Sequence, residues 1–449
     1  MSSARIASIL KSKLANSPLA QGIVGAFGLR LVYTGLSFVI SILLARVLGT
    51  SGFGTYTYAV VWAYFLSVPA TLGFDNFVVR EIAVYQSQSN WPLMRGLLSW
   101  ASKAVFVFSV TIALFAILVA WILDKGAYSE PFIGICLAMV LMPALSLRNV
   151  RRGAMRGLQN ITKGLLPELL IDPLILITLT GTAYLIAPQH LSALWVIVFY
   201  GIGTVTTLFI LNRFLIRSLP TAVKLAPTYS KGKAWLTGAF PFLLIESIPI
   251  INAQADVLML GALKGVEAVG LYVPISRGAQ LITFILMAVS SSLAPTIAKT
   301  YADKRLMDLQ QTVTKSVRVV AGIAFLFAAA LIVCGNAYLG LFGPGFVAGQ
   351  RALYLLCVST FIATSIGLAR GILNMTGHER FTATLGWITT TLNILLNLIL
   401  IPRWGVEGAA LATSISLLVG AFSSLIAVRQ KLGIDATLMG LPAKTIKPK

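Results

Sequence analysis

The stretch LGTSGFGTYTYA at residues 48–59 has a counterpart, KGVEAVGLYVPI, at residues 264–275. Two glycines and a tyrosine recur at a constant shift of 216 residues: Gly49, Gly54 and Tyr56 match Gly265, Gly270 and Tyr272. The pair Arg152–Gly153 recurs as Arg370–Gly371 at a nearby shift of 218. Repeats almost half a chain apart predict two similar halves, whereas similar turn chemistry in unrelated loops is the alternative explanation.

The composition places both halves in a membrane. The chain of 449 residues is 57% hydrophobic and 11% charged, whereas about a quarter of an ordinary soluble domain is charged. About 20 apolar residues suffice to cross a bilayer as a helix. Twelve apolar runs fit this length, near 23–47, 56–73, 98–123, 131–147, 165–187, 191–211, 235–261, 268–294, 317–339, 352–374, 381–401 and 406–428.

The Lys and Arg residues predict the orientation of these spans. With the N-terminus in the cytoplasm, 28 of the 35 Lys and Arg residues lie in cytoplasmic segments and four lie outside. Such a bias is typical of membrane proteins. We therefore attribute the net charge of +21 to topology and contact with anionic lipid, and expect no nucleic-acid partner.

We expect an all-α integral membrane protein with two six-helix lobes around a central cavity. An even number of spans in each half gives parallel repeats, related by a pseudo-two-fold axis along the membrane normal. Both termini are expected in the cytoplasm. The predicted segments are a basic N-terminal tail that is amphipathic or without structure (1–21), a first lobe (22–218), a basic linker (219–234), a second lobe (235–428) and a basic C-terminal tail (429–449).

Common catalytic and cofactor motifs do not occur in the sequence. The three cysteines are far apart and the two histidines lie in different loops, so neither a metal site nor a catalytic triad is expected. No G-x-x-x-x-G-K-[ST] loop for ATP occurs. We expect a transporter without a cofactor, driven by an ion gradient or by the membrane potential, rather than an enzyme.

Charged residues inside the spans are the candidates for function, because a charge at bilayer depth usually faces a bundle interior or an aqueous cavity. Arg30 begins a polar stripe in the first span that includes Ser37. Arg46 lies at the outer end of the same span, where an interfacial anchor is the competing interpretation. In the eighth span, Arg277 shares a face with Gln280.

The seventh span carries Glu246, Asn252 and Asp256 on one side. Pro241 and Pro249 in the same span predict a kink or local unwinding. Glu246 lies 216 residues after Arg30. This shift suggests that the two charges face one cavity and pair in one conformational state, either at the cargo or as a purely structural ion pair.

The fifth span carries two carboxylates on one face, Glu168 and Asp172. They could hold a proton or a sodium ion. They could instead balance the basic cluster RNVRRGAMR at residues 148–156, and their position near the cytoplasmic end favours this second interpretation.

Six motifs are spread over nearly the full length of the chain: LLARVLGTSGFGTYTYA, LGFDNFVVREIA, RRGAMRGLQN, GVEAVGLYVPIS, RGILNMTGHER and PRWGVEGAALATSIS. Together they resemble the motifs of bacterial polysaccharide flippases in the multidrug/oligosaccharidyl-lipid/polysaccharide exporter superfamily. The resemblance implies a multi-pass protein of the bacterial inner membrane for O-antigen, lipopolysaccharide or exopolysaccharide synthesis. It would move an oligosaccharide on undecaprenyl pyrophosphate to the outer leaflet by alternating access. The implied cationic cavity would contain Arg30 and Arg277.

Two other functions compete with this one. An ion-coupled multidrug exporter of the same superfamily would use Glu168, Asp172, Glu246 and Asp256 to hold cations, but Arg30 and Arg277 would repel a cationic drug. A membrane-embedded polymerase or glycosyltransferase would need a large outer loop or an acidic metal site, and neither is evident. If H+ or Na+ drives transport, Glu246 and Asp256 are the first candidates. A complex with the polysaccharide polymerase is compatible with the sequence, which leaves the oligomeric state open.

Overall fold

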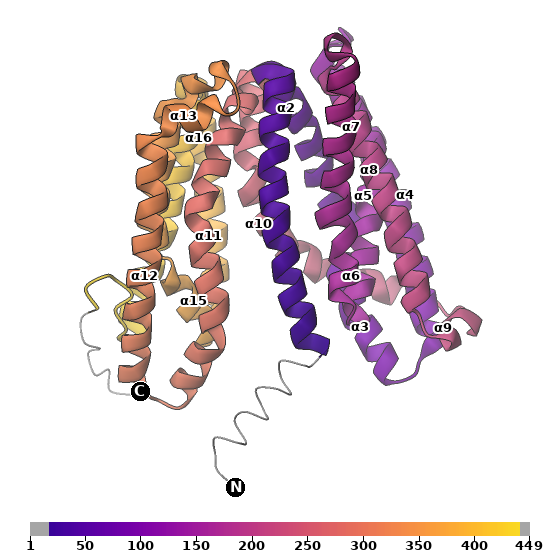
Figure 1. Ribbon diagram of the computed structural model, residues 1–449. Coiled ribbons are helices and arrows are strands. Elements are labelled where there is room, and N and C mark those ends of the chain that lie inside the picture. Colours follow the sequence, from indigo (N-terminus) through magenta and orange to yellow (C-terminus); the bar gives the residue numbers. More distant parts are fainter. Residues whose placement is uncertain (1–17, 441–449) are drawn as a thin grey trace. The chain divides into compact units, whose positions relative to one another are not determined.

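The computed structural model describes residues 18–440, and these are helical almost throughout, with no β-strand (Figure 1). Ten helical segments of this part of the chain are long and apolar enough to cross a membrane. The predicted all-α membrane fold is confirmed. The first half contains α2 (Pro18–Thr71), α3 (Phe74–Ser87), α4 (Trp91–Leu123), α5 (Glu130–Gly157), α6 (Ile161–Leu166), η1 (Pro167–Ile171), α7 (Asp172–Ile186), η2 (Pro188–His190), α8 (Ala193–Ser218) and α9 (Thr221–Leu225).

The second half has the same all-helical character. It contains α10 (Gly232–Lys264), α11 (Val266–Ala302), α12 (Leu306–Val333), α13 (Gly335–Gly340), η3 (Pro344–Gly349), α14 (Gln350–Ser365), α15 (Leu368–Met375) and α16 (Glu379–Leu432). Both α2 and α16 are 54 residues long and contain one non-helical glycine, Gly49 and Gly405 respectively. Each therefore has room for the two spans predicted there, and the count of twelve stays a prediction.

The described residues form two compact units, and their boundary differs from the predicted one. One unit comprises residues 18–48 and 55–250, and the other comprises Gly49–Gly54 and residues 251–440. The division lies inside α10, not in the predicted linker 219–234. The predicted N-terminal tail lies almost entirely outside the described residues.

The core of the first unit explains this boundary. The start of α10 packs into it, since Trp235 and Ala239 are buried together with Phe77 of α3. The indole of Trp235 donates a hydrogen bond of 3.0 Å to the hydroxyl of Tyr85. Gly73 has a positive φ, and a Cβ there would lie 2.4 Å from the carbonyl oxygen of Ala239. The first half of α10 is therefore part of this unit.

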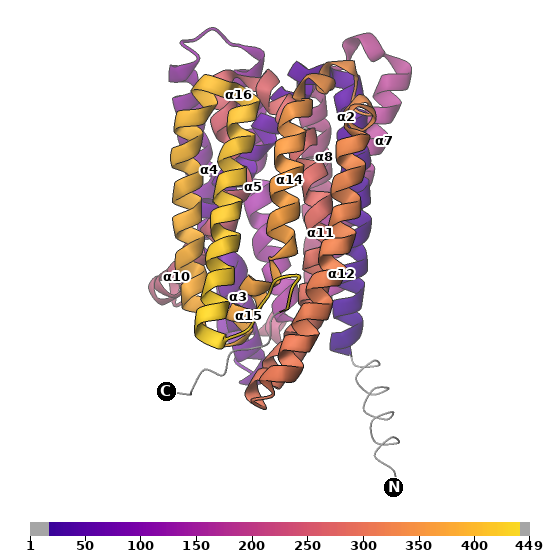
Figure 2. The ribbon, with the colours of Figure 1, turned by 90° about the vertical axis from the view of Figure 1, so that its left-hand side faces the viewer.

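The core of the second unit joins α11, α12, α14, α15 and α16, which lie side by side in Figure 2. The chain end also packs there, because Ile434 and Ala436 are fully buried. The side-chain amide of Gln310 donates a hydrogen bond of 2.8 Å to the backbone carbonyl of Asp435. It also accepts a hydrogen bond of 2.8 Å from the backbone N–H of Asp435. The predicted C-terminal tail starts at residue 429, whereas α16 runs to Leu432 and the next residues are anchored to α12.

The repeated stretches meet inside the second unit. Gly49 and Gly265 share a positive φ with an extended ψ, a conformation that favours glycine. A Cβ on Gly54 would lie 1.8 Å from the carbonyl oxygen of Val266, and a Cβ on Gly270 would lie 2.0 Å from that of Thr50. Each glycine therefore meets the residue four positions before its counterpart.

The match between Arg152–Gly153 and Arg370–Gly371 does not extend to the packing around the two glycines. A Cβ on Gly153 would lie 2.1 Å from the carbonyl oxygen of Asp75, so this glycine lets α5 approach α3 closely. Gly371 has open space at the same position.

Candidate functional site

Asp256 is a buried carboxylate inside a membrane-spanning helix. Its side chain lies in the second half of α10, and the residue is 7% exposed. One oxygen accepts hydrogen bonds from the hydroxyls of Tyr272 (2.6 Å) and Thr413 (2.5 Å). The other accepts from the amide of Asn397 at 2.7 Å. Three neutral donors from α11 and α16 therefore hold the carboxylate.

The surroundings of Asp256 contain further oxygens but no paired cation. The ion pairs among the described residues do not include Asp256. Asn397 donates 3.1 Å to the side-chain oxygen of Asn393, and its own Oδ1 is buried without a hydrogen-bond partner. A buried charge is costly unless it is paired or protonated. Carboxylate, amide and hydroxyl oxygens are the ligands that hard cations prefer, so the cluster suits a proton or a small monovalent cation.

The sequence identified Asp256 but not its partners. The signal that could have found Asn397 is its spacing from Asn393, since the two are four apart in an apolar span and so share a helix face. Tyr272 belongs to the repeated stretch, but its recurrence does not indicate a contact with Asp256. Nothing in the sequence singles out Thr413.

Glu168 and Asp172 belong to a second cluster, in the first unit. Arg148 forms an ion pair with Asp172 and lies 3.9 Å from Glu168, while Arg152 pairs with Glu168 at 2.7 Å. Thr207 of α8 donates 2.5 Å to Asp172. Two cations therefore face two carboxylates, an arrangement that agrees with the interpretation that these acids balance the basic cluster.

The backbone at this cluster is irregular. Residues Pro167–Ile171 form one turn of π-helix between α6 and α7, with Glu168 inside it and Asp172 directly after it. A π-turn changes the direction of the side chains that follow. Arg148 and Arg152 are four apart on α5 and therefore share one face. In the seventh span, α10 stays helical through Pro241 and Pro249, and a kink at these prolines stays a prediction.

Glu246 is half-buried in the first half of α10, and so belongs to the first unit. Its charged neighbours are Asp75, Arg156 and Arg152. The ion pairs among the described residues do not include Glu246 or Arg30. Glu246 and Asp256 thus belong to different units, and the pairing of Arg30 with Glu246 in another state stays a prediction.

The polar stripe of the first span is satisfied by its own helix. The hydroxyl of Thr34 donates to the carbonyl of Arg30, that of Ser37 to Thr34 and that of Ser41 to Ser37, at 2.8–2.9 Å. The Arg30 side chain is exposed. Arg46 is exposed as well, on the same helix.

The remaining predicted cavity residues lie in the second unit. Asn252 and Gln280 are exposed. Arg277 is half-buried beside Tyr338, whose hydroxyl donates 2.8 Å to the carbonyl of Pro274. The predicted cationic residues thus divide between the units, with Arg30 and Arg46 in one and Arg277 in the other.

Comparisons with known proteins agree with this fold. A family model described as polysaccharide biosynthesis protein matches residues 19–301, more than half of the chain, and a model described as MatE matches residues 250–399. The probable flippase AglR of Haloferax volcanii is 25% identical over 421 residues, which cover 92% of this chain and 83% of AglR.

Two solved structures have the same fold. An inward-facing multidrug resistance MATE family transporter of the MOP superfamily is 14% identical with a TM-score of 0.73, covering 89% of this chain and 94% of its own. The lipid II flippase MurJ is 14% identical with a TM-score of 0.66, covering 91% and 87%. The chain belongs to the polysaccharide biosynthesis protein family. The predicted resemblance to polysaccharide flippases of this superfamily is confirmed.

Proposed function

We propose that this protein is a flippase that moves an oligosaccharide linked to undecaprenyl pyrophosphate from the cytoplasmic to the outer leaflet. It would work by alternating access in a bacterial inner membrane, with both termini in the cytoplasm, and would catalyse no covalent step. The proposal is supported by the family match over residues 19–301 and by a flippase relative along 92% of the chain.

We further propose that a proton or a sodium ion drives the cycle by binding at Asp256. The observation that carries this step is a buried carboxylate held by three neutral donors, with the buried oxygen of Asn397 left unpartnered. A cation that neutralises Asp256 would change its hydrogen bonds to α11 and α16 together. A coupling ion shifts the equilibrium between two conformations only if it binds one of them more tightly. A change in these hydrogen bonds would provide such a difference.

The membrane potential would also favour movement of the cargo toward the outer leaflet. Moving one charge through 100 mV is worth about 2.3 kcal/mol. A diphosphate cargo is anionic, so a cytoplasm at negative potential favours its outward movement.

The test is leaflet exchange of a fluorescent undecaprenyl-pyrophosphate oligosaccharide in proteoliposomes, under imposed Na+, H+ and K+ gradients. We expect a Na+ or H+ gradient to accelerate flipping at least severalfold, and Asp256→Asn to abolish the acceleration. Asp303→Asn is the control, because Asp303 belongs to an exposed ion pair. Flipping that ignores all gradients in the wild type would exclude coupling at Asp256. No flipping under any condition would exclude the flippase itself.

A multidrug exporter is the second candidate, because the MatE match covers residues 250–399 and thereby includes Asp256, Asn393 and Asn397. In the same proteoliposomes, this function predicts gradient-driven movement of a cationic dye such as rhodamine 6G. Dye movement without movement of the lipid-linked oligosaccharide would favour the exporter.

A further inference from the structure

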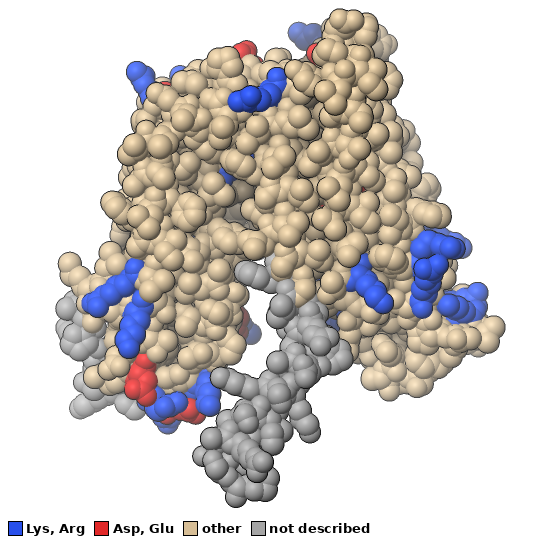
Figure 3. Space-filling view, in the orientation of Figure 1, with Lys and Arg blue, Asp and Glu red and all other residues tan. Residues whose placement is uncertain are grey.

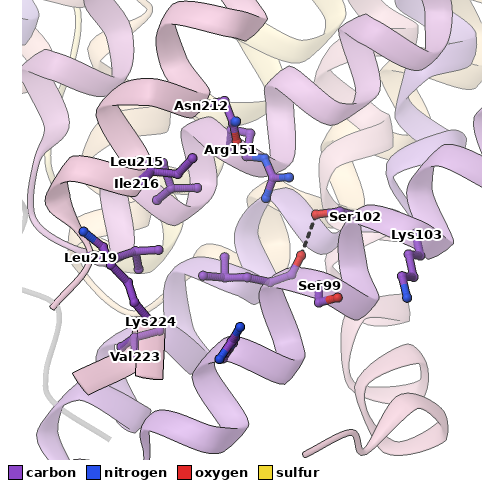
Figure 4. A pocket seen from close by; sticks show the side chains of 12 residues that line it. Ser99, Ser102, Lys103, Arg151, Asn212, Leu215, Ile216, Leu219, Val223 and Lys224 are labelled. Atoms are coloured by element: carbon purple, nitrogen blue, oxygen red, sulfur yellow. Dashed lines mark hydrogen bonds between the residues drawn. The ribbon is translucent and has the colours of Figure 1, made fainter. Parts of the chain in front are cut away.

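A cavity of about 480 Å³ opens in the first unit between α4, α5, α8 and α9. Figure 4 shows the side chain of Arg151 directed from α5 toward Ser102 of α4, with Lys103 on the same helix as Ser102. Asn212 comes from α8 and Lys224 from α9. The cavity is at the end of the helices that the Lys and Arg distribution predicts to be cytoplasmic.

The polar lining of this cavity is entirely cationic or neutral. Arg95, Lys103, Arg151 and Lys224 line it together with two serines and Asn212, and the lining contains no acidic residue. Figure 3 shows Lys and Arg gathered where α9 and the nearby ends of α4 and α8 lie. Four positive charges without a countercharge favour an anion with several oxygens, such as a phosphate group.

Arg151 distinguishes this cavity from the neighbouring ion-pair cluster. Arg148 and Arg152 on the same helix are paired with carboxylates. Arg151 is half-buried, and among the described residues it has neither an ion pair nor a hydrogen-bonded side-chain partner. Arg95 donates 2.6 Å to the carbonyl of Ala226, which positions its guanidinium beside α9. The charge of Arg151 is therefore available to a ligand.

The helices around the cavity continue into exposed apolar faces. Phe106 of α4 is one turn beyond Ser102 and Lys103 and is 50% exposed; Phe209 of α8 is one turn before Asn212 and is 66% exposed. Ile216 lines the cavity itself and is 46% exposed. A ligand that filled the cavity and followed these faces would have an anionic head and apolar chains.

We propose that this cavity binds the head group of an anionic phospholipid of the cytoplasmic leaflet, with its acyl chains along α4 and α8. Basic pockets between helices on the cytoplasmic side are suited to such head groups. Charge complementarity selects the phosphate, and the exposed phenylalanines select a lipid over a free phosphate. This inference does not depend on what the protein transports.

The experiment is native mass spectrometry of the full chain in detergent, titrated with phosphatidylglycerol, phosphatidylcholine or inorganic phosphate. We expect phosphatidylglycerol to bind at least tenfold more tightly than phosphatidylcholine, and inorganic phosphate at millimolar concentration to leave it bound. The double variant Lys103→Gln/Lys224→Gln changes two exposed residues and should weaken the binding of phosphatidylglycerol at least fivefold. Arg151→Gln should weaken it by a similar factor.

Lys163→Gln is the matched control, since Lys163 is an exposed cation of the same unit outside the cavity; it should bind like the wild type. Equal binding of the two lipids, or wild-type binding by the double variant, overturns the proposal. Displacement by inorganic phosphate would assign the cavity to a free anion instead. Displacement by undecaprenyl pyrophosphate at submicromolar concentration would assign it to the cargo, and the lipid proposal would again be wrong.

Discussion

Asn397 donates one hydrogen bond to Asp256, 141 residues away in the sequence, and leaves its own carbonyl oxygen buried without a partner. An unpaired buried oxygen costs free energy, about 1–3 kcal/mol in typical proteins. The second unit therefore has an oxygen ready for a ligand beside its buried carboxylate. A coupling cation would satisfy both groups at once.

Thr413 is the most direct test of this arrangement. Thr413→Val removes a hydroxyl that donates 2.5 Å to Asp256 and changes the side-chain volume little. Because the cation-free carboxylate loses a donor that stabilises its charge, we expect the cation concentration for half-maximal transport to fall about five- to tenfold, which corresponds to about 1–1.4 kcal/mol. Ion-dependent transport in proteoliposomes measures this. Thr390→Val is the control, because the Thr390 hydroxyl bonds a carbonyl of its own helix; the same shift in both variants would contradict a specific role for Thr413.

The Arg148–Asp172 pair should be required for stability. The side chains of Arg148 and Asp172 are 5% and 11% exposed, and removing one partner of a buried pair typically costs about 3–5 kcal/mol. Arg148→Ala should therefore lower the melting temperature in detergent by several degrees or prevent folding. Arg305→Ala removes a partner of exposed pairs and should change stability by less than about 1 kcal/mol. Equal effects of the two variants would show that burial of the pair is unimportant.

Gln310 should anchor the chain end. Gln310→Leu leaves the N–H and carbonyl of Asp435 without their 2.8 Å partners, at about 1–3 kcal/mol for each buried group. We expect a lower melting temperature and faster proteolysis after Leu432. Gln311→Leu changes the exposed neighbour and provides the comparison. Unchanged proteolysis in the Gln310 variant would count against the anchor.

The close contacts of Gly54 and Gly270 predict that an alanine at either position destabilises the protein. Ala at Gly54 or at Gly270 would force a Cβ to within about 2 Å of a backbone carbonyl, so each variant should lose about 1–3 kcal/mol of stability. Gly322→Ala introduces a Cβ into open space in α12 and should be neutral or slightly stabilising. Thermal unfolding in detergent compares the three variants. If Gly270→Ala behaves like Gly322→Ala, the close contact does not persist in solution.

The sequence predicted features that local spacing determines. Glu168 and Asp172 are four apart, as are Arg148 and Arg152, so two helix faces of opposite charge could be matched without knowing the fold. Apolar runs predicted the spans for the same reason. The partners of Asp256 come from α11 and α16, and only tertiary packing brings them together.

Composition alone does not show how the residues around two predicted segment boundaries pack. Residues 219–234 look like a basic linker, but α10 joins the first unit through residues that follow directly, beginning with Trp235. Residues after Leu432 look like the start of a basic tail, yet Ile434 and Ala436 are apolar enough to be buried. Short apolar stretches next to charged ones carry too little periodicity to reveal this.

The contact between the repeated stretches also bears on how the chain arose. Gly54 faces the carbonyl of Val266 as Gly270 faces that of Thr50, so the same position on each side meets the same position on the other. This reciprocity is the mark of an isologous interface, as in a symmetric homodimer. A half-length ancestor that paired with its own twin through this glycine would have formed the contact twice. Gene duplication and fusion would then have turned an interface between two molecules into a fold within one.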